Sequence, residues 1–150
     1  MVDDMTMNPE QSRLKSLAEF RYQMRKFISF SEIASERCGV PTQQYQLMQV
    51  IAAIPDDQQA SITYLAERMI LRHNSAVELV DRAERAGLVG RESDPKDMRR
   101  SLVRLTPEGH KILQQLVAEH LTELAPRCEH LIRALHELQG AMEQQTQSGA

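Results

Sequence analysis

The stretch between residues 61 and 107 constrains the fold of this chain more than any other, because turn and cap signals divide it into short pieces. Residues 62–70 carry apolar side chains at helical spacing, and Ser61 stands where a helix N-cap is expected. A break precedes a second helical pattern over about 74–86, which Gly87 ends. These signals predict two short helices joined by a tight turn.

A strand-turn-strand pattern follows the second helix at once. Residues 88–105 contain two short strand-like runs around the turn signal Asp94-Pro95. Thr106 and Pro107 then begin another helix, with an N-cap residue followed by proline at the first helical position. Two short helices followed by a hairpin predict a winged helix-turn-helix, whose first helix begins near residue 42.

Long helical patterns flank the winged helix-turn-helix part, which covers residues 42–105. Apolar residues recur at spacings of three and four over 10–38 and over 106–145, with an interruption at Pro126. Their apolar stripes require cover, and a two-fold dimer is the simplest closed arrangement that provides it. We therefore expect one domain over residues 1–150, mainly α with a small β-hairpin, whose N- and C-terminal helices mediate dimerisation. The polar tail from residue 144 is expected to fray.

Composition limits the class of protein. The net charge is −3, yet residues 62–104 carry two more basic than acidic side chains, so an anionic partner is expected to bind there. No apolar run approaches the roughly 20 residues that cross a bilayer, and the N-terminal segment is too polar for a signal peptide. We expect a cytoplasmic protein without membrane contact. Cys38 and Cys128, ninety positions apart, are expected to be reduced thiols.

Five short motifs occur in order between Leu65 and Gly109. They are Leu65-Ala66, Leu79-Val80-Asp81-Arg82, Gly87-Leu88-Val89, Asp97-Met98-Arg99 and Leu105-Thr106-Pro107-Glu108-Gly109. On these motifs the chain resembles the MarR family of bacterial transcription regulators. The resemblance covers nearly the whole chain in helix order, and it departs at Met98, where the family more often has arginine. It implies a homodimer that binds double-stranded DNA at a pseudo-palindromic operator, with half-sites about 10 bp apart.

The helix near 74–86 is the candidate recognition helix, because residues near the N-terminus of such a helix reach base edges in the major groove. Helix capping is the alternative role for Asn74 and Ser75, and Arg82 is expected to meet phosphates or an acidic neighbour. The candidate contacts are Arg72, His73, Asn74, Ser75, Val77, Glu78 and Arg82.

The hairpin tip is the candidate minor-groove contact, because a narrow A·T-rich minor groove attracts a slim cationic side chain. Arg99 and Arg100 lie at this tip, with Lys96 nearby. The family resemblance implies that Arg99 enters the groove and that Asp97 orients it through a salt bridge. A merely solvated, charged tip is the alternative.

Relatives often bind small aromatic acids or phenols, so the resemblance suggests an effector pocket, with core packing as the alternative role for the same side chains. The candidate pocket residues are Phe20, Met24, Phe27, Phe30, Tyr45, Met48 and Tyr64. Oxidant sensing through a thiol is a further alternative, although Cys38 lies at the end of the first helix and not near its start. The histidines form no metal-binding spacing, and no cofactor or metal is expected.

No catalytic motif is present, so an enzyme is not expected. The sequence is interpreted as a homodimeric, sequence-specific DNA-binding transcription regulator, a repressor released by a small aromatic or phenolic ligand. The alternatives are a thiol-based oxidant sensor and a winged-helix protein-interaction module that does not bind DNA.

Overall fold

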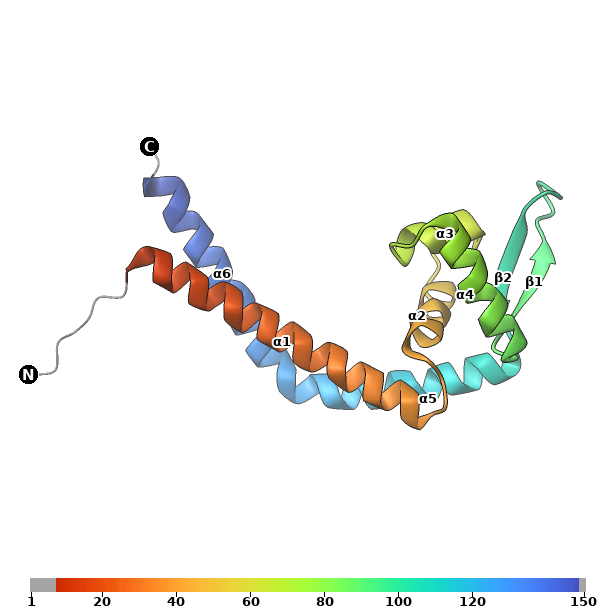
Figure 1. Cartoon of the computed structure of the whole chain (residues 1–150), viewed down its shortest axis with the longest axis horizontal. Helices are drawn as coiled ribbons and strands as arrows, with labels where there is room; N and C mark the ends of the chain where they lie inside the picture. The colour runs from red at the N-terminus through yellow and green to blue at the C-terminus, as the bar shows by residue number, and fades with distance from the viewer. Residues whose placement is uncertain (1–7, 149–150) are drawn as a thin grey trace, which may run out of the picture. The chain divides into compact units, whose positions relative to one another are not determined.

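The computed structural model describes residues 8–148, so most of the polar N-terminal segment and the last two residues lie outside the description. The described chain is mainly helical with one two-stranded antiparallel hairpin, which confirms the predicted fold class (Figure 1). The elements are α1 (Pro9–Arg37), α2 (Thr42–Ala52), α3 (Ile62–Arg68), α4 (His73–Arg85), β1 (Val89–Ser93), β2 (Ser101–Leu105), α5 (Pro107–Leu124), a 3₁₀ helix (Ala125–Arg127) and α6 (Cys128–Ser148).

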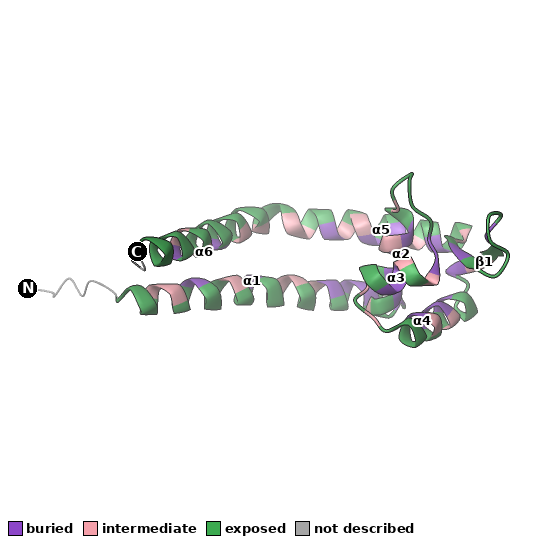
Figure 2. Cartoon of the chain, turned by 90° about the horizontal axis from the view of Figure 1, so that it is seen from above, coloured by how far each residue is buried: buried purple, intermediate pink, exposed green. Residues whose placement is uncertain are grey.

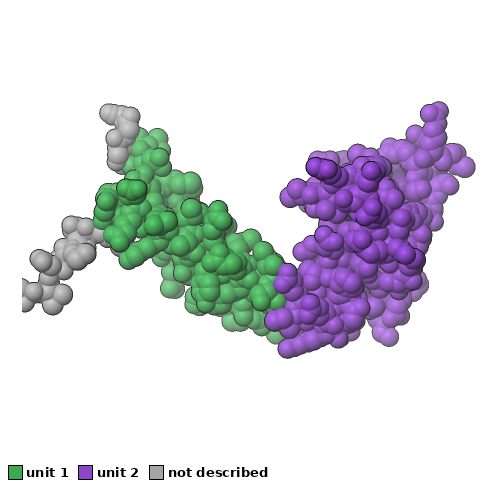
Figure 3. All heavy atoms as spheres, in the orientation of Figure 1, with its two compact units in different colours: residues 1–31, 121–150 green, residues 32–120 purple. Residues whose placement is uncertain are grey.

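The chain divides into two compact units (Figure 3). The helical unit contains the described residues of 1–31 and 121–150, and the winged-helix unit contains residues 32–120. The winged-helix unit is therefore wider than the 42–105 expected from sequence. It also takes in the end of α1 and most of α5, because Ala34 and Leu116 are buried within it.

The core of the winged-helix unit is aliphatic, with one tyrosine. Buried residues are concentrated in this unit, while α1 and α6 are largely exposed (Figure 2). Tyr45 stacks obliquely on the His120 ring at a centroid distance of 4.8 Å, and the His120 Nδ1 lies 2.7 Å from the Leu116 carbonyl oxygen. The largest fully buried side chains are those of Tyr45, Leu47, Met48, Leu65, Leu79, Val80, Val89, Val103 and Leu116.

The hairpin pairs Val89 with Leu105 at its base and Ser93 with Ser101 near its tip. Its second strand is tied to the approach to α3, because the Val103 N–H donates to the Ala60 carbonyl at 2.9 Å. At the base, the Thr106 N–H donates to the Leu88 carbonyl at 3.1 Å. These bonds fix where the wing leaves the core.

Gly87 ends α4 in the left-handed conformation, with φ +76°, as the sequence predicts. The Leu88 N–H donates to the Ala83 carbonyl and the Gly87 N–H donates to the Glu84 carbonyl, each at 3.0 Å. This is the Schellman pattern, in which the residue in the left-handed position favours glycine. The buried Leu88 then turns the chain into β1.

The turn between α3 and α4 uses the same hydrogen-bond pattern with isoleucine where glycine is favoured. Ile70 has φ 54°, is 92% exposed, and follows an α3 that ends at Arg68, two residues earlier than predicted. The Leu71 N–H donates to the Ala66 carbonyl at 2.8 Å, so a Schellman turn closes the helix. A β-branched residue is strained in this conformation.

In the helical unit, α1 and α6 expose much of their apolar surface. Their exposed large apolar side chains include Leu14, Leu17, Met24, Ile28, Ile132, Leu135 and Met142. The expected fraying from residue 144 is wrong for the described residues, because α6 continues to Ser148. Three of residues 144–148 are glutamine, which favours helix, and none of the five is glycine or proline. Among residues 8–148, no helix is both long and apolar enough to cross a membrane.

Candidate nucleic-acid interface

The helix α4 begins one residue earlier than predicted. Arg72 is its N-cap, in extended conformation and without a side-chain capping bond, and His73 is its first residue. Asn74 and Ser75 therefore lie inside the first turn, so the capping role suggested for them is wrong. Their side chains make no hydrogen bond to any residue between 8 and 148. Their donors and acceptors are available to an external partner.

The two faces of α4 differ sharply in burial. Ala76, Leu79, Val80 and Ala83 are buried against the core. The opposite face carries the candidate contact residues, of which Val77 is half-buried and the remaining ones are exposed: Arg72, His73, Asn74, Ser75, Glu78 and Arg82. A helix with this polar face has the width that fits a DNA major groove.

The tip of the wing, residues 94–100, is held by two aspartates. The buried Asp94 accepts the Lys96 N–H on its Oδ1 at 2.9 Å, and its own N–H donates to the Arg100 carbonyl at 2.9 Å. Asp97 accepts the Arg99 N–H on its Oδ1 at 3.1 Å. Short side chains that bond the main chain two residues on are typical of tight turns. The loop is therefore fixed by its own backbone.

Asp97 orients Arg99 through the main chain, not through the ion pair that the family resemblance implies. No ion pair joins Asp97 to Arg99 within the described chain. Because the Asp97 carboxylate is turned inward to the Arg99 N–H, the Arg99 guanidinium is left exposed. Lys96 and Arg100 are exposed as well.

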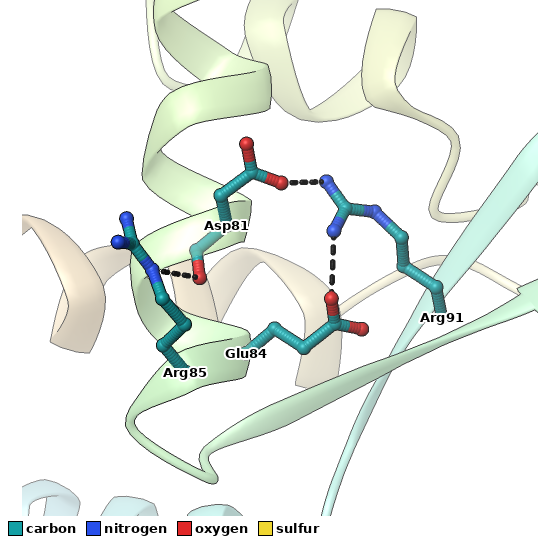
Figure 4. Close-up of polar contacts among 4 residues, drawn as sticks. All are labelled: Asp81, Glu84, Arg85 and Arg91. Carbon is teal, nitrogen blue, oxygen red and sulfur yellow. Dashed lines mark hydrogen bonds and ion pairs between the residues drawn. The ribbon is translucent and has the colours of Figure 1, made fainter.

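Arg91, which sequence reasoning did not single out, connects the wing to α4. Its guanidinium lies 2.6 Å from Asp81 Oδ1 and 2.8 Å from Glu84 Oε1, as Figure 4 shows. Burial lowers the pKa of Arg91, but the hydrogen bonds and charges of the two carboxylates outweigh it and raise the pKa overall. The sequence feature that could have indicated this contact is a pair of acidic residues three positions apart on the helix, followed by a basic residue in the next strand.

The start of α4 and the side of the wing toward its tip share a hollow of about 300 Å³. Arginine side chains of the wing line it, together with His73 and Val77 of α4 and two hydroxyl groups near the start of α3. The lining residues are Ser61, Ile62, Thr63, His73, Val77, Arg91, Arg99, Arg100 and Ser101. The structure thus brings the candidate contacts His73, Val77, Arg99 and Arg100 together, although they come from two separate elements.

Comparison with known proteins identifies the family. A sequence model described as MarR family matches residues 39–100. The transcriptional regulator HosA of Escherichia coli O111:H- is 43% identical over 70 residues, which are 47% of this chain and 50% of that protein. Over residues 39–100, the chain belongs to the MarR family. The match spans about half the length of this curated relative.

Solved structures agree with the fold of this chain. A MarR family transcription regulator gives a TM-score of 0.71 at 22% identity, over 90% of each chain. A mutant of MepR from S. aureus bound to an oligodeoxyribonucleotide gives 0.62 at 18% identity, over 87% of this chain and 94% of that one. At these identities the likeness shows the winged helix-turn-helix fold alone.

The candidate effector residues are divided between the two units. Phe20, Met24, Phe27 and Phe30 lie on α1 in the helical unit. In the winged-helix unit, Tyr45 and Met48 are wholly buried in the core, and Tyr64 is half-buried on α3. Burial raises the pKa of the Tyr45 hydroxyl, and a hydrogen bond from Gln49 partly offsets this.

The two cysteines are free thiols. Cys128 is exposed, whereas Cys38 is half-buried. Burial raises the pKa of the Cys38 thiol, and the Glu119 carboxylate raises it further. Because the thiolate is the reactive form, this environment does not favour oxidant sensing by Cys38. Within residues 8–148, no group of three or more His, Cys, Asp or Glu side chains is arranged to hold a metal ion.

Proposed function

We propose that this MarR family member is a homodimeric, sequence-specific DNA-binding transcription regulator and acts as a repressor. The carrying observation is that one unit presents the exposed polar face of α4 and the exposed cations of the wing tip together around a shared hollow. In the proposed complex, α4 lies in a major groove and Arg99 enters the adjacent minor groove. Phosphate contacts supply most of the affinity, which falls steeply with salt.

Binding to operator DNA selected from random sequence tests this proposal. Arg99→Ala should weaken binding about tenfold, because a base-edge or groove contact by arginine contributes on the order of 1–3 kcal/mol. Arg104→Ala is the matched control. It removes the same charge from the same hairpin, but from β2, where Arg104 pairs with Glu92 in an exposed ion pair that contributes little to stability.

Fluorescence anisotropy with labelled operator should therefore separate the two variants. Equal affinity of Arg99→Ala and the native protein would reject the wing contact. If the native chain binds no DNA at any salt concentration, it is instead a winged-helix protein-interaction module.

The exposed apolar residues of α1 and α6 support a two-fold dimer, because leaving such stripes in water is unfavourable. Leu135 is 48% exposed on α6. Leu135→Glu should give monomers with weak operator affinity, whereas Gln147→Glu, which adds a charge at an exposed position on another face of the same helix, should remain dimeric. Sedimentation velocity distinguishes the two, and a dimer that persists in Leu135→Glu would contradict this placement.

We also propose release of the DNA by a small aromatic or phenolic effector. Phe20, Met24 and Tyr64 keep part of their surface accessible, so they support this role better than the wholly buried Tyr45 and Met48. Such a ligand acts only through different affinities for the DNA-competent and the released conformations. A screen of aromatic acids and phenols for loss of anisotropy tests it, and Phe20→Ala should lower the sensitivity to any compound that is found.

A further inference from the structure

Arg91 holds two acidic side chains of α4 at the same time. Its Nη2 contacts Asp81 and its Nη1 contacts Glu84, at 2.6 and 2.8 Å, and the Arg91 side chain is 25% exposed (Figure 4). The guanidinium is planar and its donors have fixed directions, so two simultaneous bonds define both distance and orientation. We call this three-residue arrangement the fork. A lysine ammonium has no such geometry.

The fork lies where other links between α4 and the wing are lacking. At the base, the chain passes through Gly87 and Leu88, and Thr106 donates from its hydroxyl to the Gly87 carbonyl at 2.6 Å. Beyond the base, the contacts of Arg91 are the sole hydrogen bonds or ion pairs between side chains of α4 and of the hairpin within the described chain. The other strand is held separately, because the Val103 N–H donates to the Ala60 carbonyl ahead of α3, so the fork is the tie of β1 to α4.

We propose that Arg91 is a positioning residue that joins α4 and the wing into one rigid DNA-reading body. This inference rests on the proposed function. A wing that is already held in place loses little conformational freedom when it binds DNA. The free energy of the Arg99 contact is then not reduced by the cost of ordering the wing. With the fork broken, the wing must be ordered during binding, and the contribution of Arg99 falls.

Charge and positioning predict opposite results for one pair of substitutions. Asp81→Ala with Glu84→Ala removes both acceptors of the Arg91 guanidinium and two negative charges beside the DNA-binding face. Electrostatics alone therefore predicts tighter DNA binding, whereas loss of the fork predicts weaker binding. Asp57→Ala with Glu67→Ala is the matched control, because it removes two exposed carboxylates of the same unit that take part in no ion pair within the described chain.

The DNA-binding test uses the full chain and its selected operator at fixed salt. The fork-broken double variant should bind about tenfold more weakly than the native protein, and the control double variant should bind equally or more tightly. Arg99→Ala should cost about tenfold in the native background but less than about threefold in the fork-broken one. A uniform loss of stability would not lower the cost of Arg99→Ala in the fork-broken background. Arg91→Lys, which keeps the positive charge but loses the planar geometry, should lower the cost of Arg99→Ala in the same way. Tighter binding by the fork-broken variant would overturn the proposal.

A DNA-free measurement separates this inference from the proposed function. Spin labels at Ser75→Cys and Met98→Cys, with both native cysteines changed to serine, report the distance between the start of α4 and the wing tip. The distance distribution should broaden in the fork-broken variant and remain narrow in the control. An unchanged distribution would overturn the fork alone, whereas failure of the native protein to bind any DNA would overturn the proposed function and the DNA-reading role together.

Discussion

The substitution Gly109→Ala tests how closely the start of α5 packs against the wing. Gly109 lies in the first turn of α5, where its N–H donates to the Thr106 hydroxyl at 3.0 Å. A Cβ atom built on Gly109 would lie 2.9 Å from the Leu88 carbonyl carbon and closer still to its oxygen. Real Cβ atoms essentially never approach another heavy atom so closely, so the backbone of α5 or of Leu88 has to move.

Two effects of opposite sign determine the outcome. Alanine is favoured over glycine in a helix by about 1 kcal/mol. Overpacking against a backbone that cannot move aside costs about 3 kcal/mol, the upper part of the usual range. The expected net loss of stability is therefore about 2 kcal/mol, which corresponds to a fall in Tm of about 4–8 °C for a chain of this size.

Gly90→Ala is the control, since its Cβ would meet nothing within 4 Å. Gly90 lies in β1, where alanine is favoured by about 0.5–1 kcal/mol, so this variant should be slightly more stable than the native protein. Thermal unfolding followed by far-UV circular dichroism compares the three proteins, at one protein concentration because dimerisation makes Tm concentration-dependent. A Tm for Gly109→Ala at or above the native value would refute the close approach to Leu88.

Two further predictions concern single residues of the winged-helix unit. Ile70→Gly should raise the free energy of unfolding in urea by about 1 kcal/mol, because it removes left-handed strain from an exposed residue that packs on little. Unchanged or lower stability would contradict that strain. Cys38 should react with iodoacetamide more slowly than a free cysteine thiol at mildly alkaline pH, because its raised pKa leaves less thiolate and its thiol is half-buried. Peptide mass spectrometry over time measures this rate, and reaction at or above the free-thiol rate would count against it.

Features that depend on local chemistry could be predicted from the sequence. Ser61 caps α3, since its hydroxyl accepts the Tyr64 N–H at 3.2 Å, and Thr106 caps α5 in the same way. Gly87 is left-handed, as its place after the helix requires. In each case the residue type alone satisfies the backbone groups left free at a helix end, so a pattern of neighbours is sufficient.

Features that depend on contacts between elements could not be predicted. The start of α4 at His73 has no capping side chain to mark it, because Arg72 takes the N-cap position without a side-chain bond. In the sequence, Arg91 is one of several basic residues in the predicted hairpin. Only the packing of β1 on α4 places it beside Asp81 and Glu84. Asp94 reads as a turn residue, and its burial depends on how the tip folds back on itself. Sequence spacing contains none of these distances.

Chemical protection of the selected operator by the full chain tests the central claim most directly. Dimethyl sulfate methylates guanine N7 in the major groove and adenine N3 in the minor groove, so one reagent reports on both grooves. The native protein should protect guanine N7 within each half-site and adenine N3 in the flanking A·T-rich sequence. Arg99→Ala should lose the adenine protection and keep the guanine protection. Absence of protection in both grooves, or equal loss of both in Arg99→Ala, would contradict DNA reading by α4 and the wing.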